Sequence, residues 1–181
     1  YTKSKSLFNL YTFYSRPILL PGALAGALIS PYAGRLFDHS GAFRPLLFSS
    51  ITLISGTGLF FATSSKISVW GVTLLYILLR VGFNLGFSNS MSDASLHITS
   101  EKNSNFNSIF NTFQQYAGSL GTSVLAAVIS VNQFNNGNLS HSTEQGSRIA
   151  YGILLILAIV SLITVIAVKY LFNDTIKTEQ R

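Results

Sequence analysis

Long apolar runs are the feature that most constrains this chain of 181 residues. A helix crosses the hydrocarbon core of a bilayer, about 30 Å thick, with about 20 mainly apolar residues, because each residue adds about 1.5 Å of length. Five runs approach that length, at residues 14–33, 46–63, 67–90, 105–131 and 149–172. They are continuous, whereas the strands of a membrane barrel alternate in polarity over about ten residues. The sequence therefore predicts an all-α integral membrane protein with about five transmembrane helices.

The composition agrees with a lipid environment and argues against several classes of function. Charged residues make up 10% of the chain and hydrophobic residues 48%, whereas a soluble domain carries about a quarter charged residues. The net charge is +6, but the Lys and Arg residues form no basic stripe, so we expect no nucleic-acid partner. No cysteine, HExxH helix, phosphate-binding glycine loop or activated nucleophile occurs. We therefore expect neither an enzyme nor a cofactor or metal site, and we expect Asp93 and His97, at helical spacing, to be solvated.

The segments outside the apolar runs predict the organisation of the chain. We expect residues 1–13 to be the tail of a preceding helix or an outer loop, and residues 34–45 and 132–148 to be polar loops in water. Residues 173–181 are expected to form a cytoplasmic tail. The chain begins at Tyr1 without a signal peptide, so we expect the amino-terminal part of a longer chain to be missing.

The distribution of basic residues bears on orientation, because cytoplasmic loops carry an excess of Lys and Arg. The count is nearly even when the segment before the first run is included. Without that segment, the side of residues 34–45 holds six basic residues and the other side two: Arg35, Arg44, Lys102, Lys169, Lys177 and Arg181 against Lys66 and Arg148. This comparison favours a cytoplasmic location for residues 34–45.

Small residues recur at helical spacing in three of the runs. They are Gly22, Gly26, Ser30 and Gly34 in the first, Gly82 and Gly86 in the third, and Gly118 and Gly121 in the fourth. Such residues align on one helix face and let another helix approach closely. The pattern predicts helix packing, which a transporter requires but which does not prove transport.

Polar side chains inside the apolar runs are the candidate functional residues. Arg80 lies near the middle of the third run, where a charge costs at least about 2.5 kcal/mol and is tolerated with a partner or water. It is either a substrate or proton-site residue, or a structural ion pair or snorkelling side chain, and Asn84 shares its face. Asn111, Gln114 and Gln115 in the fourth run either face a central cavity or form interhelical hydrogen bonds. No acidic residue lies in the middle of any run.

Two stretches of sequence resemble a known family. Residues 20–45 read LPGALAGALISPYAGRLFDHSGAFRP, and residues 111–121 read NTFQQYAGSLG. Both are similar to the major facilitator superfamily and, within it, to the carboxy-terminal half of the fourteen-helix drug/proton antiporters. The resemblance covers nearly the whole chain.

The resemblance implies a conformational latch at Gly34, Arg35, Asp38, Gly41 and Arg44, which repeat the signature of a cytoplasmic loop in this superfamily. Physically, the two glycines permit tight turns, and Asp38 can pair with a basic residue or cap the next helix. The sequence departs from the family pattern in two places. His39 stands where a basic residue is usual, and Phe43 displaces Arg44 by one position.

The resemblance also implies a function. A half of this superfamily has six helices, and the loss of the first leaves the five expected here. The whole protein would be a multi-pass cell-membrane transporter that exports a small lipophilic or cationic substrate in exchange for protons by alternating access. Its partners would be the lipid bilayer, the substrate, protons and the missing amino-terminal half. The alternatives are a self-contained five-helix membrane subunit with a scaffolding or channel role, and a membrane enzyme, for which the necessary cluster of residues is lacking.

Overall fold

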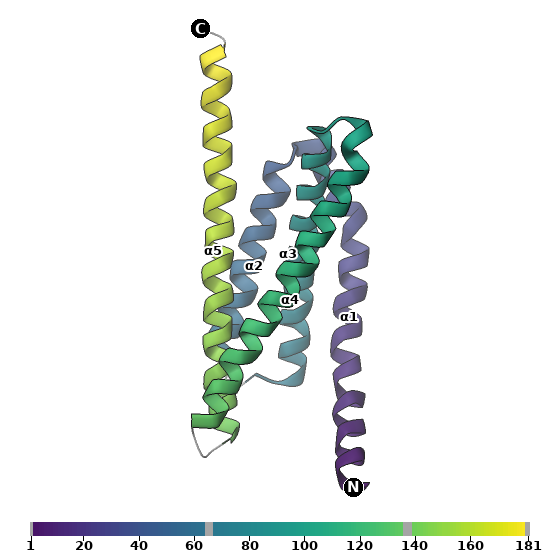
Figure 1. The fold of residues 1–181 in the computed structure, drawn as a ribbon, viewed down its shortest axis with the longest axis vertical. Coiled ribbons are helices and arrows are strands. Elements are labelled where there is room, and N and C mark those ends of the chain that lie inside the picture. The colour runs from purple at the N-terminus through teal and green to yellow at the C-terminus, as the bar shows by residue number, and fades with distance from the viewer. Residues whose placement is uncertain (1, 64–66, 136–138, 180–181) are drawn as a thin grey trace.

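The computed structural model describes residues 2–63, 67–135 and 139–179 (Figure 1). The helices are α1 (Thr2–Ser40), α2 (Phe43–Thr63), α3 (Val69–Leu96), the 3-10 helix η1 (Ser100–Lys102), α4 (Asn103–Asn135) and α5 (Leu139–Glu179). No strand occurs in these three ranges. Successive α-helices run in alternating directions, so that the start of α1 and the end of α5 lie at opposite ends of the bundle (Figure 1). The predicted all-α fold with five helices is confirmed.

Within the described residues, three helical stretches are long and apolar enough to cross a membrane, namely Phe43–Thr63, Val69–Leu96 and His141–Leu171. They correspond to the predicted spans 46–63, 67–90 and 149–172. The predicted spans 14–33 and 105–131 are helical as well. The described part of α4 combines an apolar second half with an amide-rich first half, which lowers its mean hydropathy. Membrane crossing by α1 and α4 stays a prediction.

Several segments expected to be tails or loops are instead helical. Residues 2–13 continue into α1 without a break, so they form neither a separate helix tail nor an outer loop. Most of 34–45 also belongs to helices, because α1 ends at Ser40 and α2 begins at Phe43. Most of 132–148 is likewise helical, in α4 and α5. The helices α4 and α5 contain 33 and 41 residues, more than the about 20 that a bilayer needs, so polar sequence extends them instead of ending them.

The turn between α1 and α2 depends on one glycine. Gly41 has a φ of 69°, in the left-handed region. Its backbone N–H donates to the carbonyl of Phe37 at 2.8 Å, which is the pattern of a left-handed helix carboxy-terminal cap. The Ser40 hydroxyl donates to the carbonyl of Leu36 at 2.6 Å. A two-residue turn at Gly41 and Ala42 therefore replaces the longer loop that was expected.

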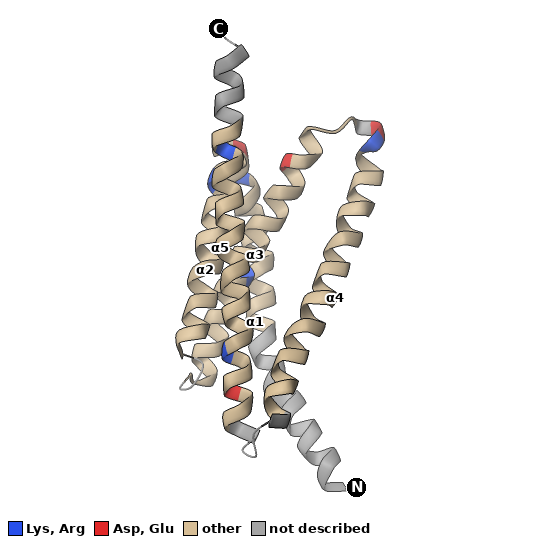
Figure 2. Ribbon diagram, turned by 60° about the vertical axis from the view of Figure 1, so that its left-hand side comes forward, with Lys and Arg blue, Asp and Glu red and all other residues tan. Residues whose placement is uncertain are grey.

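The helices pack in a chain of neighbours. Helix α1 packs mainly against α3, α2 lies against both α3 and α5, and α4 packs mainly against α5. Figure 2 shows α4 inclined away from α1 and α3. The buried positions of α2 and α3 are mostly small or polar: Pro45, Ser49, Ser50, Gly56, Thr57, Phe60, Thr73, Gly82 and Asn89. Small side chains at these contacts allow the close helix approach that is typical of membrane bundles.

Charged residues lie mostly near the ends of the helices (Figure 2). Two of them bind aromatic rings and join α5 to α2. The Nζ atom of Lys169 is 4.0 Å from the ring centroid of Phe43, and the Cζ atom of Arg148 is 5.0 Å from that of Phe61. Because Phe43 and Phe61 lie at opposite ends of α2, these cation–π contacts hold the pair of helices at both ends.

Candidate functional site

Two glycines of α1 make room for a polar stripe on α3. A Cβ atom on Gly22 would collide with the ring of Tyr76 and would lie 3.5 Å from Cγ of Arg80. A Cβ atom on Gly26 would collide with the amide of Asn84 and would lie 4.0 Å from Nε of Arg80. Both glycines are buried. Tyr76, Arg80 and Asn84, which are four residues apart and share one helix face, therefore lie directly over the two glycines.

The charge of Arg80 is uncompensated in the described part of the chain. Its Nε atom is buried and has no hydrogen-bond partner there. Asn84 does not supply one, because its Nδ2 donates to the backbone carbonyl of Arg80 at 2.9 Å. A guanidinium group carries five N–H donors and no acceptor. The arrangement can therefore bind an anion or ordered water at the contact between α1 and α3.

The polar candidates of α4 lie elsewhere. Asn111 and Gln115 are exposed and Gln114 is half-buried, and the Nδ2 of Asn111 donates to the carbonyl of Asn107 at 2.9 Å. No hydrogen bond or ring contact of the described side chains joins these three residues to Arg80 or Asn84. The structure thus brings Arg80 and Asn84 together and leaves the amides of α4 on an open helix face.

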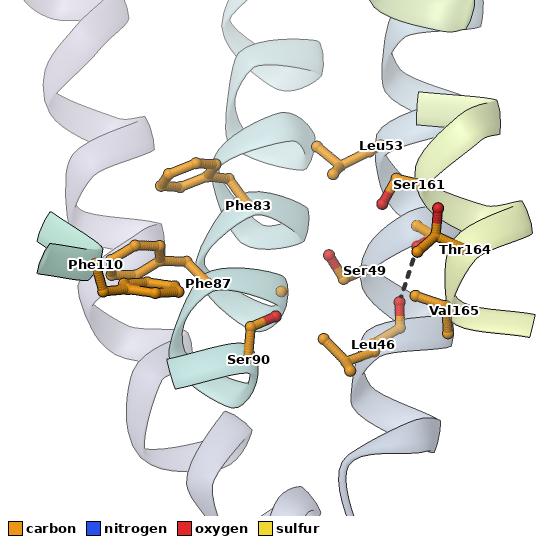
Figure 3. Close-up of a pocket in the computed structure, with 12 residues that line it drawn as sticks. Leu46, Ser49, Leu53, Phe83, Phe87, Ser90, Phe110, Ser161, Thr164 and Val165 are labelled. Carbon is orange, nitrogen blue, oxygen red and sulfur yellow. Dashed lines mark hydrogen bonds between the residues drawn. The ribbon is translucent and has the colours of Figure 1, made fainter. Parts of the chain in front are cut away.

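An open pocket of about 510 Å³ lies between α2, α3, α4 and α5 (Figure 3). Its wall is apolar with interspersed hydroxyls, and it is lined by Leu46, Ser49, Ser50, Leu53, Phe83, Gly86, Phe87, Ser90, Phe110, Ser161, Thr164 and Val165. Figure 3 shows Phe87 and Phe110 on one side, with ring centroids 5.4 Å apart, and Ser161 and Thr164 on the other. The volume lies within the range of about 300–1,000 Å³ that is common for small-molecule sites.

Sequence reasoning missed this pocket. The sequence feature that could have indicated it is the presence of hydroxyl side chains in otherwise apolar runs. Serine and threonine are, however, also tolerated in membrane helices, because their hydroxyls bond to the backbone of their own helix. Such bonds are present here: Ser50 Oγ donates to the carbonyl of Leu46 at 3.0 Å, and Thr164 Oγ1 to that of Val160 at 2.9 Å. Ser49 is different, because its Oγ donates across the helix contact to the carbonyl of Gly82 at 2.7 Å.

The other small residues divide into packed and open positions. Gly82 faces α2, where an added Cβ would lie 3.2 Å from Thr52 and 3.3 Å from Leu53, and Gly86 faces the hydroxyl of Ser49. An added Cβ would meet nothing within 4 Å at Gly34, Gly118 or Gly121, and Ser30 is exposed. Helix α3 therefore contacts α2 through its own glycines and contacts α1 through the glycines of α1.

The predicted latch residues cluster around the turn between α1 and α2. Arg35, Asp38 and Arg44 are exposed. Within the described ranges Asp38 neither pairs with a basic side chain nor caps α2. The inserted Phe43, which displaces Arg44, lies under Lys169, so the insertion has a packing role. The charged groups of the latch are therefore free to contact atoms outside this bundle.

Metal-binding side chains do not converge in the part of the chain that the structure covers. No group of three or more His, Cys, Asp or Glu residues there could hold a metal ion. His97 Nδ1 lies 2.8 Å from the backbone carbonyl oxygen of Asp93. The ring of His97 therefore contacts the backbone of its own helix.

Comparison with known proteins agrees with the helical membrane architecture. The family model described as the Major Facilitator Superfamily matches residues 4–122. The lincomycin resistance protein LmrB of Listeria monocytogenes is 29% identical over 126 residues, which cover 68% of this chain and 26% of that protein. The uncharacterized MFS-type transporter YcnB of Bacillus subtilis is 26% identical over 181 residues, which cover 98% of this chain and 36% of that protein. No solved structure gives a significant match.

The chain thus spans about a quarter to a third of the length of these curated relatives. Proteins of the matched family are transporters and not enzymes. The family match extends from α1 into α4 and includes both stretches whose sequence resembled this superfamily. It leaves out the last part of α4 and all of α5. This chain, a multi-pass helical membrane protein, belongs to the major facilitator superfamily.

Proposed function

We propose that this chain is part of a secondary active transporter that exports lipophilic or cationic drugs across the cell membrane in exchange for protons. The transporter would work by alternating access, as in the fourteen-helix drug/proton antiporters, with the amino-terminal half of the protein forming the other wall of its cavity. Membership of a transporter family supports transport. The name of the LmrB relatives, lincomycin resistance protein, supports the export of drugs.

The observation that carries the proposal is the position of Arg80 and Asn84 over Gly22 and Gly26. A charged side chain inside an apolar helix is costly and is retained where it faces a partner or a water-filled path. Here it lies at a glycine contact, where two helices approach closely without interlocking side chains from both sides. Such a contact suits helices that must shift against each other while they keep a polar group at mid-depth.

The open face of α4 supports the same proposal. Asn111, Gln114 and Gln115 present amides that can bind polar groups of many compounds, and the adjacent Gly118 and Gly121 leave that helix face unfilled. In the proposed transporter this face lies toward the cavity. Arg35, Asp38 and Arg44 lie on the cytoplasmic side and act as the latch, with the final segment of the chain as a cytoplasmic tail.

Proton exchange is tested on the whole transporter in inside-out membrane vesicles, whose interior is acidified by respiration. Addition of a lipophilic cation should raise the internal pH, because each imported cation is exchanged for protons. Collapse of the pH gradient with an ionophore should stop cation accumulation. The variant Arg80→Gln should strongly reduce this exchange, because it removes the charge inside the membrane on which the proposal rests. Lys102→Gln, on the exposed η1 turn, is the matched control.

Two results would contradict the proposal. Cation accumulation that continues at the same rate after the pH gradient has been collapsed would exclude proton antiport. A whole protein that moves no lipophilic or cationic compound in either direction would exclude drug export.

A further inference from the structure

Among the described residues no counter-charge faces the guanidinium of Arg80, and its own helix does not supply one. The nearest acidic residue along α3 is Asp93, thirteen residues on, which places it about 20 Å away along the helix axis. The neighbours on the same face, Tyr76 and Asn84, are uncharged, and Asn84 directs its amide N–H to the backbone.

The neighbouring helix α1 also offers no acid at this depth. Its acidic residue is Asp38, which is exposed near the end of the helix, sixteen residues beyond Gly22. Helix α2 contains no acidic residue, and the other acidic residues of the sequence, Glu101, Glu144, Asp174 and Glu179, lie near helix ends or turns. In the part of the chain that the structure describes, therefore, no acidic side chain reaches the buried Nε of Arg80.

We propose that Arg80 binds a carboxylate at the middle of the membrane, supplied either by a helix of the transporter outside this chain or by the transported compound. The inference rests on the proposed function in that it places this chain within a larger transporter. Ionisable side chains inside membrane helices pair with one another or line a path for substrate. The planar guanidinium fits a carboxylate through two parallel hydrogen bonds, which an ammonium group cannot reproduce.

The glycines of α1 support this assignment. Gly22 and Gly26 leave the space above them to Tyr76, Arg80 and Asn84, so that the guanidinium lies at a helix contact instead of extending into lipid. Tyr76 and Asn84 flank it one turn before and one turn after, which limits the directions from which a partner can approach. A carboxylate that enters between them would neutralise the charge.

The test uses Arg80→Gln, Arg80→Lys and the control Lys102→Gln in the whole transporter. Thermal unfolding is measured in detergent without substrate, and transport is measured in proteoliposomes with a cationic, a neutral and an anionic compound of similar size. If a helix supplies the carboxylate, Arg80→Gln should lower the unfolding midpoint and reduce transport of all three compounds. Neutralisation of one Asp or Glu in an apolar span outside this chain should then restore the midpoint.

If the compound supplies the carboxylate, the results differ. Arg80→Gln should leave the midpoint unchanged without substrate. It should reduce the transport of the anionic compound much more than that of the cationic and neutral compounds, and it should remove the thermal stabilisation by the anionic compound. Under either source Arg80→Lys should have a weaker effect of the same kind, because it keeps the charge and loses the paired hydrogen bonds. It thereby tests the site when Arg80→Gln does not reach the membrane.

The proposal is overturned if both Arg80 variants match Lys102→Gln in midpoint and in the transport of every compound. It is also overturned if no neutralised acid restores the lowered midpoint of the Arg80 variants and their loss of transport is the same for the cationic, neutral and anionic compounds. Arg80 would then interact with water or lipid alone. These outcomes are separate from the failure of proton antiport. If the whole protein exports no drug, the unfolding midpoint still tests this inference. A midpoint that Arg80→Gln lowers and a neutralised acid restores would support the carboxylate partner, although the proposed function had failed.

Discussion

The contact between α1 and α3 and the open face of α4 contain the same kind of sequence and have different structures. Gly22 and Gly26 are covered by large side chains of α3, whereas nothing lies within 4 Å of a Cβ added to Gly118 or Gly121. Helix α4 instead approaches α5 closely at another glycine. A Cβ on Gly146 would lie 2.9 Å from the Cα of Ile129.

The difference shows that spaced small residues predict a capacity for close approach and do not identify the partner. The contact between α4 and α5 includes the adjoining ends of the two helices, where Gln133 Nε2 donates to Thr143 Oγ1 at 2.8 Å. A short connection favours this contact, because it keeps the two helix ends together. A Cβ added to Gly118 or Gly121, farther from this connection, meets no atom of α5 within 4 Å. In the proposed transporter the face of α4 that contains them lies toward the cavity.

The largest expected effect comes from Gly26→Leu compared with Gly118→Leu. A leucine at residue 26 would collide with Asn84 and force α1 away from α3, which should lower the free energy of unfolding by about 1–3 kcal/mol, as for other overpacked contacts. At residue 118 the new side chain meets open space within this bundle, and loss of a glycine from the helix interior should raise the free energy of unfolding by about 0.5–1 kcal/mol. Unfolding of the whole transporter by SDS in mixed micelles measures both.

The control for that comparison is Gly26→Ala, which introduces a smaller clash with the same amide. It should fall between the wild-type protein and Gly26→Leu. If Gly118→Leu lowered the free energy of unfolding as much as Gly26→Leu, the comparison would fail, because the face of α4 would then be tightly covered in the whole protein.

A smaller effect separates two glycines that both lie in open space. Gly41 has a positive φ, so Gly41→Ala should lower the free energy of unfolding by about 1–2 kcal/mol through backbone strain. Gly34 lies within α1, so Gly34→Ala should raise it by about 0.5–1 kcal/mol, because alanine loses less conformational entropy in a helix. The same SDS titration tests both signs. Equal changes at the two positions would show that the turn conformation at Gly41 is not maintained in the whole protein.

The helical fold could be predicted from the apolar runs, because a continuous run of membrane length has few alternative structures. Helix ends were predicted less well. Residues 2–13 and most of 132–148 are polar, and polarity was interpreted as loop, although a helix that extends beyond the bilayer is stabilised equally well in water. At residues 34–45, the glycine at position 41 was correctly expected to permit a turn, but the shortness of that turn depends on its hydrogen bond to Phe37.

The candidate site was predictable in part. The chemistry of Arg80 in an apolar run indicated a special position, but only the packing shows that Gly22 and Gly26 lie beneath it. The pocket around Ser49 and Phe110 combines residues of four helices, and no spacing within one helix indicates which faces converge. The roles of Asn111, Gln114 and Gln115 stay predictions, since their face is open in this structure.

The smallest expected effect compares two serines of α2, and it tests how strongly packing alone holds this bundle. Ser49 is 4% exposed and donates across the contact to the carbonyl of Gly82 at 2.7 Å, whereas Ser55 is exposed and donates to Ile51 of its own helix at 2.8 Å. Interhelical hydrogen bonds in membranes contribute about 0.6 kcal/mol on average, so Ser49→Ala should lower the free energy of unfolding by about that amount and Ser55→Ala should leave it unchanged. SDS titration of both variants beside the wild-type protein measures the difference. A loss well above that of a single hydrogen bond at Ser49→Ala would mean that polar bonds hold α2 against α3, and the glycine contacts would then be permissive for packing but not its main source of stability.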